Sequence, residues 1–490
     1  MDSQHSLPKY TLRNHTDPIS ALALYYPARD TVVPYLISAD ASGKIVIWDL
    51  ITRRPVHTFA SGVIKAQVIS LQLLSNNLLS VLSKDHKLSI FHNKGDEIKS
   101  WDLVFHVPVN TLNFANCIVY HLDNEQLGLV CCNTQDSEAI DIYTFILNEQ
   151  HSLKRQFNAL NFFGSIKELI TEREVNNKKL NFEKLGIVMK FTRDCESKVI
   201  FIGTESGLVL GFKIHDNISF SSKIINNRDF KENKPKSGLS KLLSADDQIP
   251  NAQRHFTNVI ELVYVSDLHC PNPILDLEIK DNILLSCSTL KKIGSFCLKN
   301  ISAQDSQTRM LDSYKFSTTD NNITLMREKN LKLSDNSFYE IPFSNVSHVQ
   351  STKDYILAAD WKGETFVFSN QREISTLTPT ILATFEKSRS SIPINESSKG
   401  NLQNVNSSSG PKKANKSKVR SIIALDSTTN SLDETLHSNL ELMNKRRNVT
   451  KSMTPGQQRR LLKFAETSWC IIGYDDGCIS LHDLNDTRAS

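Results

Sequence analysis

Two stretches at opposite ends of this chain share one strand–turn–strand pattern, which limits the possible folds more than any other feature of the sequence. The stretches Leu36–Leu50 and Cys470–Leu484 align without a gap. In the first, apolar residues alternate on both sides of a turn that ends at Gly43, a residue able to take a positive φ. It closes on Trp48-Asp49, the dipeptide typical of repeats of about 40–45 residues that each form one four-stranded blade. Because one blade cannot bury its own faces, we expect more copies.

Five more segments fit the same template, and each ends at an aromatic residue that closes an apolar alternation. With Trp48-Asp49 and His482-Asp483 they give seven units, whose remaining ends are Phe91, Tyr143, Phe212, Phe296 and Phe368. The step from residue 48 to residue 91 is 43 residues, as a bare repeat requires, whereas the later steps are longer. We therefore predict an all-β fold, a single seven-bladed WD40-type β-propeller with long polar insertions and a short helix in its last blade. The alternative is another strand-rich fold, since aromatic-ended hairpins occur there too.

The predicted ring spans residues 1–490 as one domain, and its closure depends on the N-terminal segment. Only residues 485–490 follow the seventh unit, and they are too few and too polar to form a fourth strand. We expect residues 10–13 to supply that outer strand and so to remove the open sheet edges.

One histidine is expected to have a structural role in the first blade. His15 stands where such repeats place a histidine in a buried network, here with Ser38 and Trp48. Ser42 occupies the position of the acidic residue usually found just before the turn glycine. The network is therefore predicted to lack that carboxylate.

Composition and cysteine usage indicate an intracellular protein without catalytic chemistry. No apolar run approaches the ~20 residues of a membrane helix, and the first residues lack the charged and apolar regions of a signal peptide. The nine cysteines show neither a CxxC pair nor metal-like spacing with histidine, which favours reduced thiols buried as small hydrophobes. The chain also lacks the common nucleotide-binding, metalloprotease, hydrolase and calcium-binding motifs. We expect no catalytic, cofactor-binding or metal-binding residues, and no enzyme.

Two polar insertions are expected between the blades. The net charge of the chain is +4, yet residues 386–420 alone hold eight Lys/Arg and two Glu. Within them, residues 386–418 are rich in Ser, Asn and Lys and are predicted to be a disordered basic insertion, in which Lys412 and Lys413 are candidate partner contacts. Residues 226–255 form a second polar insertion loop in this interpretation.

A helical insertion is predicted at residues 452–466, inside the last blade. Thr454 is a good N-cap, and Pro455 suits the first helical turn. Leu461 and Leu462 lie on a partial apolar stripe and are candidate partner contacts. The alternative is that the helix packs on its own blade.

Four short strings are informative together, and the first three are more specific than the turn glycines. They are Asn110–Asn116, Cys131–Tyr143, Pro271–Asp276 and Gly473–Gly477. Together they resemble the fungal ASTRA-associated WD-repeat protein family, in patches that skip the polar insertions. The resemblance implies a subunit of the ASTRA complex, which is involved in chromatin regulation or remodelling and in the biogenesis of PI3-kinase-related kinases. The implied partners are the Tel2–Tti1–Tti2 co-chaperone trio, RuvB-like AAA+ ATPases and a large PI3-kinase-related protein.

We favour a non-catalytic protein-interaction scaffold in the nucleus, with the cytoplasm as a second location. The alternative is a chromatin or nucleic-acid binding module that acts through the basic insertion, because basic charge attracts phosphate. That insertion lacks interleaved aromatic residues for base stacking, so direct nucleic-acid binding is the weaker interpretation. An enzyme is the third possibility. We expect neither a small-molecule substrate nor a membrane partner.

Overall fold

The computed structural model describes most of the chain between residues 7 and 488. Outside that description lie residues 1–6, 29–30, 60–61, 95–97, 99, 114, 123–124, 172–173, 176–177, 180–183, 217–257, 303–310, 316–323, 329–330, 332, 335–336, 371–378, 389–415, 429–453 and 489–490. The predicted polar loop 226–255 and most of the predicted basic insertion 386–418, with Lys412 and Lys413, therefore fall outside the described residues.

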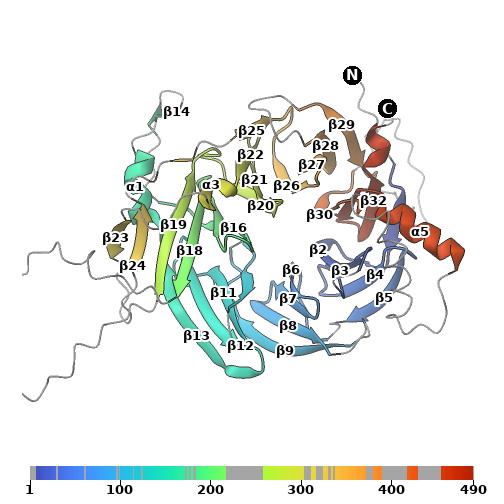
Figure 1. The fold of residues 1–490 in the computed structure, drawn as a ribbon, viewed down its shortest axis with the longest axis horizontal. Coiled ribbons are helices and arrows are strands. Elements are labelled where there is room, and N and C mark those ends of the chain that lie inside the picture. Colours follow the sequence, from blue (N-terminus) through green and yellow to red (C-terminus); the bar gives the residue numbers. More distant parts are fainter. Residues whose placement is uncertain are drawn as a thin grey trace, which may run out of the picture.

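Seven antiparallel blades are arranged as a ring around a central axis (Figure 1). Blades 1 to 3 contain β2 (Ile19–Tyr25), β3 (Tyr35–Asp40), β4 (Ile45–Asp49) and β5 (Arg54–Phe59); β6 (Val68–Ser75), β7 (Leu78–Ser83), β8 (Lys87–Asn93) and β9 (Trp101–Pro108); and β10 (Ile118–His121), β11 (Gln126–Cys132), β12 (Ile140–Ile146) and β13 (Glu149–Leu160). Blades 4 and 5 contain β16 (Val188–Arg193), β17 (Ile200–Thr204), β18 (Val209–Asp216) and β19 (Asn258–Ser266); and β20 (Ile274–Lys280), β21 (Ile283–Ser288), β22 (Lys292–Cys297) and β25 (Ser337–Glu340). Blades 6 and 7 contain β26 (Val346–Ser351), β27 (Tyr355–Asp360), β28 (Glu364–Ser369) and β29 (Ile381–Glu386); and β30 (Val419–Leu425), β31 (Trp469–Tyr474), β32 (Cys478–Asp483) and β1 (Tyr10–Arg13).

The core lies between the blades. Each inner strand contacts the inner strand of the next blade, and β30 of the last blade contacts β2 of the first. Buried side chains interlock across these contacts: Ala39 and Ile47 of blade 1 share one cluster with Val81 and Phe91 of blade 2. The prediction of a seven-bladed all-β propeller is confirmed. A blade covers its two faces only by packing against two neighbours, so the stability of each blade depends on the blades beside it.

Blade 7 takes its outer strand from the other end of the chain. β1 pairs antiparallel with β32, in a register that places Tyr10 opposite Leu481 and Arg13 opposite Cys478. Leu12 is only 2% exposed and packs in the cluster that joins blades 7 and 1. The segment expected at residues 10–13 thus covers the edge that β32 would otherwise present to solvent.

In blades 1, 4, 6 and 7, a turn glycine lies against the loop that leads into the next blade. A Cβ atom added at Gly43 would lie 2.6 Å from the carbonyl oxygen of Ile64, and one added at Gly477 would lie 2.7 Å from that of His15. Both glycines also have a positive φ. Backbone conformation and close approach therefore both require glycine here. Blade 2 lacks a turn glycine, and His86 takes the positive φ of 64° in its place.

Blade 4 carries an extension that the sequence pattern did not predict. Two strands, β23 (Leu311–Lys315) and β24 (Thr324–Glu328), lie between β22 and β25 of blade 5 in the sequence. They extend the sheet of blade 4 instead, because β24 pairs in parallel with β19. Helix α1 (Phe163–Thr171) packs beside them, and the Arg327 guanidinium donates to the carbonyl oxygen of Ser165 (Figure 1). This places α1 and the added strands on the outer side of blade 4.

The remaining elements are short. They are β14 (Glu174–Val175), β15 (Lys178–Lys179), α3 (Lys299–Ser302), α5 (Pro455–Ala465) and the 3-10 helix η2 (Asn485–Arg488). Among the described residues, no helix has the length and apolar character needed to cross a membrane.

Candidate functional site

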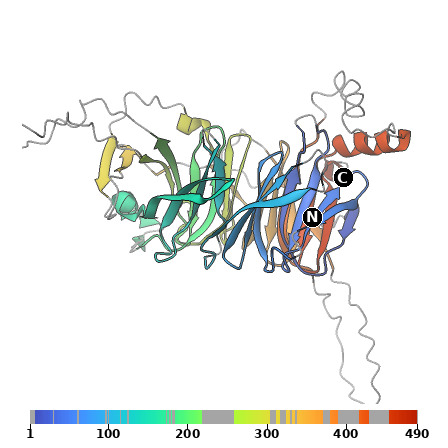
Figure 2. The same ribbon diagram turned by 90° about the horizontal axis from the view of Figure 1, so that it is seen from below.

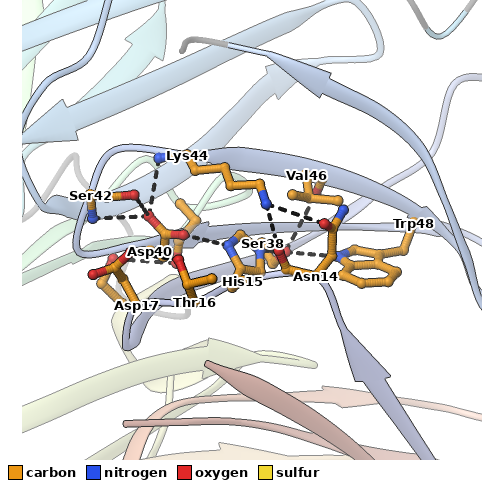
Figure 3. Close-up of polar contacts among 12 residues, drawn as sticks. Asn14, His15, Thr16, Asp17, Ser38, Asp40, Ser42, Lys44, Val46 and Trp48 are labelled. Atoms are coloured by element: carbon orange, nitrogen blue, oxygen red, sulfur yellow. Dashed lines mark hydrogen bonds and ion pairs between the residues drawn. The ribbon is translucent and has the colours of Figure 1, made fainter. Parts of the chain in front are cut away.

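A buried polar network joins the segment before β2 to strands β3 and β4 (Figure 3). His15 Nδ1 lies 2.6 Å from Asp40 Oδ2, and His15 Nε2 lies 2.7 Å from Ser38 Oγ. The indole Nε1 of Trp48 donates to the same Ser38 Oγ over 2.8 Å. The predicted network of His15 with Ser38 and Trp48 is therefore present, with Ser38 as the link between the two rings.

Asp40 supplies the carboxylate that the sequence pattern placed at position 42, so the expectation of an incomplete network is wrong. Asp40 Oδ1 accepts hydrogen bonds from the backbone N–H groups of Ser42, at 2.9 Å, and Lys44, at 3.1 Å. Burial alone would raise the pKa of the Asp40 carboxyl, but hydrogen bonds from His15 and Ser42 outweigh it and hold that pKa below its usual value. A single carboxylate two residues before the expected position can thus accept hydrogen bonds from the turn and also contact the histidine.

The order Ser38, His15 and Asp40 has the connectivity of a catalytic triad, but this arrangement is structural. The side chains of His15 and Asp40 are 0% exposed, and Ser38 is equally buried. The Ser38 oxygen also accepts a hydrogen bond from Trp48, so no face of it is open to a substrate. The network holds the first hairpin against the segment that closes the ring.

Two other blades bury a histidine among hydroxyl groups. In blade 5, His269 lies 2.9 Å from the hydroxyls of both Ser286 and Ser288. In blade 7, His482 Nε2 lies 2.8 Å from Ser480 Oγ, and its ring stacks on Phe385. Burial lowers the pKa of His269 to about 4 and that of His482 to about 3. Both imidazole side chains are therefore neutral at physiological pH.

The seven predicted repeat-end residues occupy equivalent places, each on the third strand of its blade. Trp48, Phe91, Phe212, Phe368 and His482 are buried, whereas Tyr143 and Phe296 are partly exposed. Each of them packs in a different hydrophobic cluster or ring contact, so the structure does not bring them together at one site. Asp49 and Asp483 follow two of them and accept backbone hydrogen bonds from Ile51 and Asn485.

The paired aspartates of the last blade turn anchor the loop that precedes β30. Asp476 pairs with the ammonium of Lys387 and accepts from the Ser417 hydroxyl. Asp475 accepts from the backbone N–H of Lys418. Within the described residues, no group of three His, Cys, Asp or Glu side chains has the arrangement to hold a metal ion.

Helix α5 lies outside the ring beside blades 7 and 1 (Figures 1 and 2). Thr454 is its N-cap and forms a capping box with Gln457, as Thr and Pro at this position favour. Leu461 is 0% exposed and packs in the cluster that joins blades 7 and 1, whereas Leu462 is half-buried at its edge. Of the two leucines, only Leu462 is available to a partner.

We predict that Leu461→Asp destabilises the protein by more than about 3 kcal/mol, because it places a charge in an apolar cluster. Leu462→Asp should change stability by less than about 1 kcal/mol, since that side chain already reaches solvent. Urea unfolding followed by tryptophan fluorescence compares the two. Equal losses of unfolding free energy in both variants would show that α5 does not pack with Leu461 buried and Leu462 at the edge.

Over almost its full length the chain is similar to one known protein family. A family model described as ASTRA-associated protein 1 matches residues 8–482. The chain is 38% identical over 479 residues to the ASTRA-associated protein 1 of Zygosaccharomyces rouxii, with 98% of this chain and 99% of that protein covered. It is 34% identical over 508 residues to the protein of that name from Vanderwaltozyma polyspora, with 99% and 100% covered. Among solved structures, the β-propeller domain of Cps50 (Swd1) from Myceliophteria thermophila is similar with a TM-score of 0.47 and 10% identity, over 97% of this chain and 98% of that one.

Proposed function

Because this chain belongs to the ASTRA-associated protein 1 family, we propose that it is a non-catalytic scaffold subunit of the ASTRA assembly. The observation that carries the proposal is the extent of the similarity, which covers at least 98% of this chain in both relatives. The family is thus defined over the whole ring, including both of the segments that close it.

The geometry suits a scaffold. The buried histidines and serines form hydrogen bonds within and between blades, and the ring is closed by β1. A ring closed in this way keeps its loops and edges at fixed relative positions, which is what simultaneous binding of several partners requires. Insertions such as α5 add surface outside the ring (Figure 2).

We further propose that the direct partners are among the Tel2–Tti1–Tti2 trio, the RuvB-like AAA+ ATPases and the large PI3-kinase-related protein. In this proposal the protein acts in the nucleus, in chromatin regulation and in the biogenesis of PI3-kinase-related kinases. Rigid positioning of partners is the contribution that the ring makes.

Affinity purification of the tagged full-length chain from a nuclear extract tests the proposal. We expect the co-chaperone trio and the AAA+ ATPases to be recovered both at low salt and at about 0.5 M salt, because a packed protein interface is screened less than phosphate contacts. Recovery of only nucleic acid and histones, lost at the higher salt, would instead support nucleic-acid binding through the basic insertion. Recovery of neither would contradict the scaffold proposal.

A further inference from the structure

A small cavity lies where three distant parts of the chain meet at the outer rim of blades 7 and 1. Its volume is about 40 Å³. The lining residues come from the start of β1, the turn after β4, helix α5 and the start of β31: Lys9, Tyr10, Leu50, Ile51, Arg53, Arg460, Lys463, Phe464 and Trp469. We call this the rim cavity.

The floor of the rim cavity is aromatic. Phe464 and Trp469 stack with ring centroids 4.6 Å apart, and Tyr10 lies 5.8 Å from Trp469. The indole N–H of Trp469 donates to the carbonyl oxygen of Phe464, so the floor presents apolar ring surface. Phe464 and Trp469 are buried, which holds this floor in place.

The rim of the cavity is positively charged. Four of its nine lining residues are Lys or Arg, and none is acidic. Lys9 is paired with Asp483 and lies 3.4 Å from Asp486, so its charge is compensated. Within the described part of the chain, Arg53, Arg460 and Lys463 have no such carboxylate partner. Lys463 stands in the last turn of α5, where the helix dipole favours a cation, and Arg460 Nε donates to the carbonyl oxygen of Gly456 in the same helix, 3.2 Å away.

Arg53 is held in a backbone conformation that does not suit its residue type. Its φ is 59°, in the left-handed region where glycine or asparagine is expected and other residues cost about 1 kcal/mol or more. Its side chain lies over the Tyr10 ring, with the guanidinium carbon 4.1 Å from the ring centroid. The Tyr10 ring therefore holds the Arg53 guanidinium at the cavity.

We propose that the rim cavity binds a short acidic segment of a partner protein. A cavity of about 40 Å³ takes only a few water-sized groups, so the end of one side chain of the segment fills it. Arginine forms paired hydrogen bonds with a carboxylate, and an apolar neighbour in the segment covers the aromatic floor. The expectation of a partner protein rests on the proposed scaffold function. The site itself is inferred from the cavity and the residues that line it.

Binding of a fluorescein-labelled peptide of alternating Glu, Asp and Leu residues to the full-length chain tests this, with fluorescence anisotropy as the measurement. Arg53→Gly removes the guanidinium and suits the positive φ, so the ring stays folded. We expect Arg53→Gly and Arg460→Gln to weaken binding by about tenfold each, as loss of a charge-assisted contact does. Arg460→Lys keeps the charge but not the paired donors, so its affinity should lie between those of the wild type and Arg460→Gln.

Arg459→Gln is the matched control, because Arg459 is exposed on the same helix but does not line the cavity. It should leave the affinity within about twofold of the wild type. The proposal is overturned if the peptide does not bind, if Arg459→Gln weakens binding as much as Arg460→Gln, or if a peptide with Gln and Asn in place of Glu and Asp binds equally well. It is also overturned if a single-stranded oligonucleotide competes better than the peptide.

The same variants separate this proposal from the scaffold function. If the Arg53→Gly, Arg460→Gln double variant recovers the ASTRA components from extract as the wild type does, the rim cavity is not where they dock, and the scaffold function stands. If the wild-type chain recovers none of them but binds the peptide with the expected variant pattern, the site stands and the scaffold function fails.

Discussion

Removal of residues 1–13 is expected to destabilise the whole ring by at least about 3 kcal/mol. The deletion takes away β1, exposes the edge of β32 and removes Leu12 from the cluster between blades 7 and 1. Loss of one buried leucine side chain alone costs about 2–5 kcal/mol, and the hydrogen bonds to β32 are lost as well. The melting temperature, measured by circular dichroism, should fall, and proteases should cut the ring faster.

Two point variants of the same strand sharpen this prediction. Leu12→Asp should reproduce most of the deletion, because Leu12 faces the core. Thr11→Asp, on the exposed face of β1, should leave the melting temperature nearly unchanged. An unchanged melting temperature for the deletion would mean that β1 does not close the ring.

Acidification is expected to destabilise the ring through its buried histidines, and His482 makes the sharpest test. Burial lowers the pKa of folded His482 to about 3, whereas an unfolded histidine has a pKa of about 6.5. Between these values the unfolded chain binds the additional proton, so this histidine lowers stability as the pH falls. Glu278 has the opposite effect between about pH 4.5 and pH 8, because burial raises the pKa of its folded carboxyl to about 8.

The difference between the wild type and His482→Gln isolates the histidine from those other groups. Glutamine does not titrate, so the difference in unfolding free energy should shift against the wild type by about 1.4 kcal/mol for each pH unit below about 6.5. Urea unfolding at several values between about pH 7 and pH 4.5 measures it. His151→Gln is the control, since His151 is exposed in the folded chain. A difference that does not vary with pH for His482→Gln would show that this imidazole is solvated or protonated in the folded state.

Local patterns were enough to predict the blades. Apolar alternation around Gly43 and Gly477 specifies two hairpins, and the structure places both glycines at positive φ in the turns. Helix α5 was also readable, because Thr454 and Pro455 satisfy the first turn through side-chain and backbone chemistry that needs no distant partner.

Features that depend on residues far apart in the sequence could not be predicted from local patterns. The role of Asp40 was missed because an acidic residue was expected just before Gly43, although a carboxylate two residues earlier reaches both the turn and His15. The parallel pairing of β24 with β19 was missed because it places Val259 opposite Thr324, two residues that are far apart in the sequence. Apolar periodicity carries no information about such long-range pairing.

The sequence by itself determined the number of blades, their hairpins and the helix in the last blade, because each depends on residues within one repeat. Only the tertiary structure decided which side of α5 faces the ring, with Leu461 buried and Leu462 at the edge. It also brought Arg53 beside Tyr10 and Arg460, which lie in three separate segments of the chain. The physical reason is ring closure: pairing β1 with β32 joins the two ends of the chain, and the surfaces formed there belong to neither end alone.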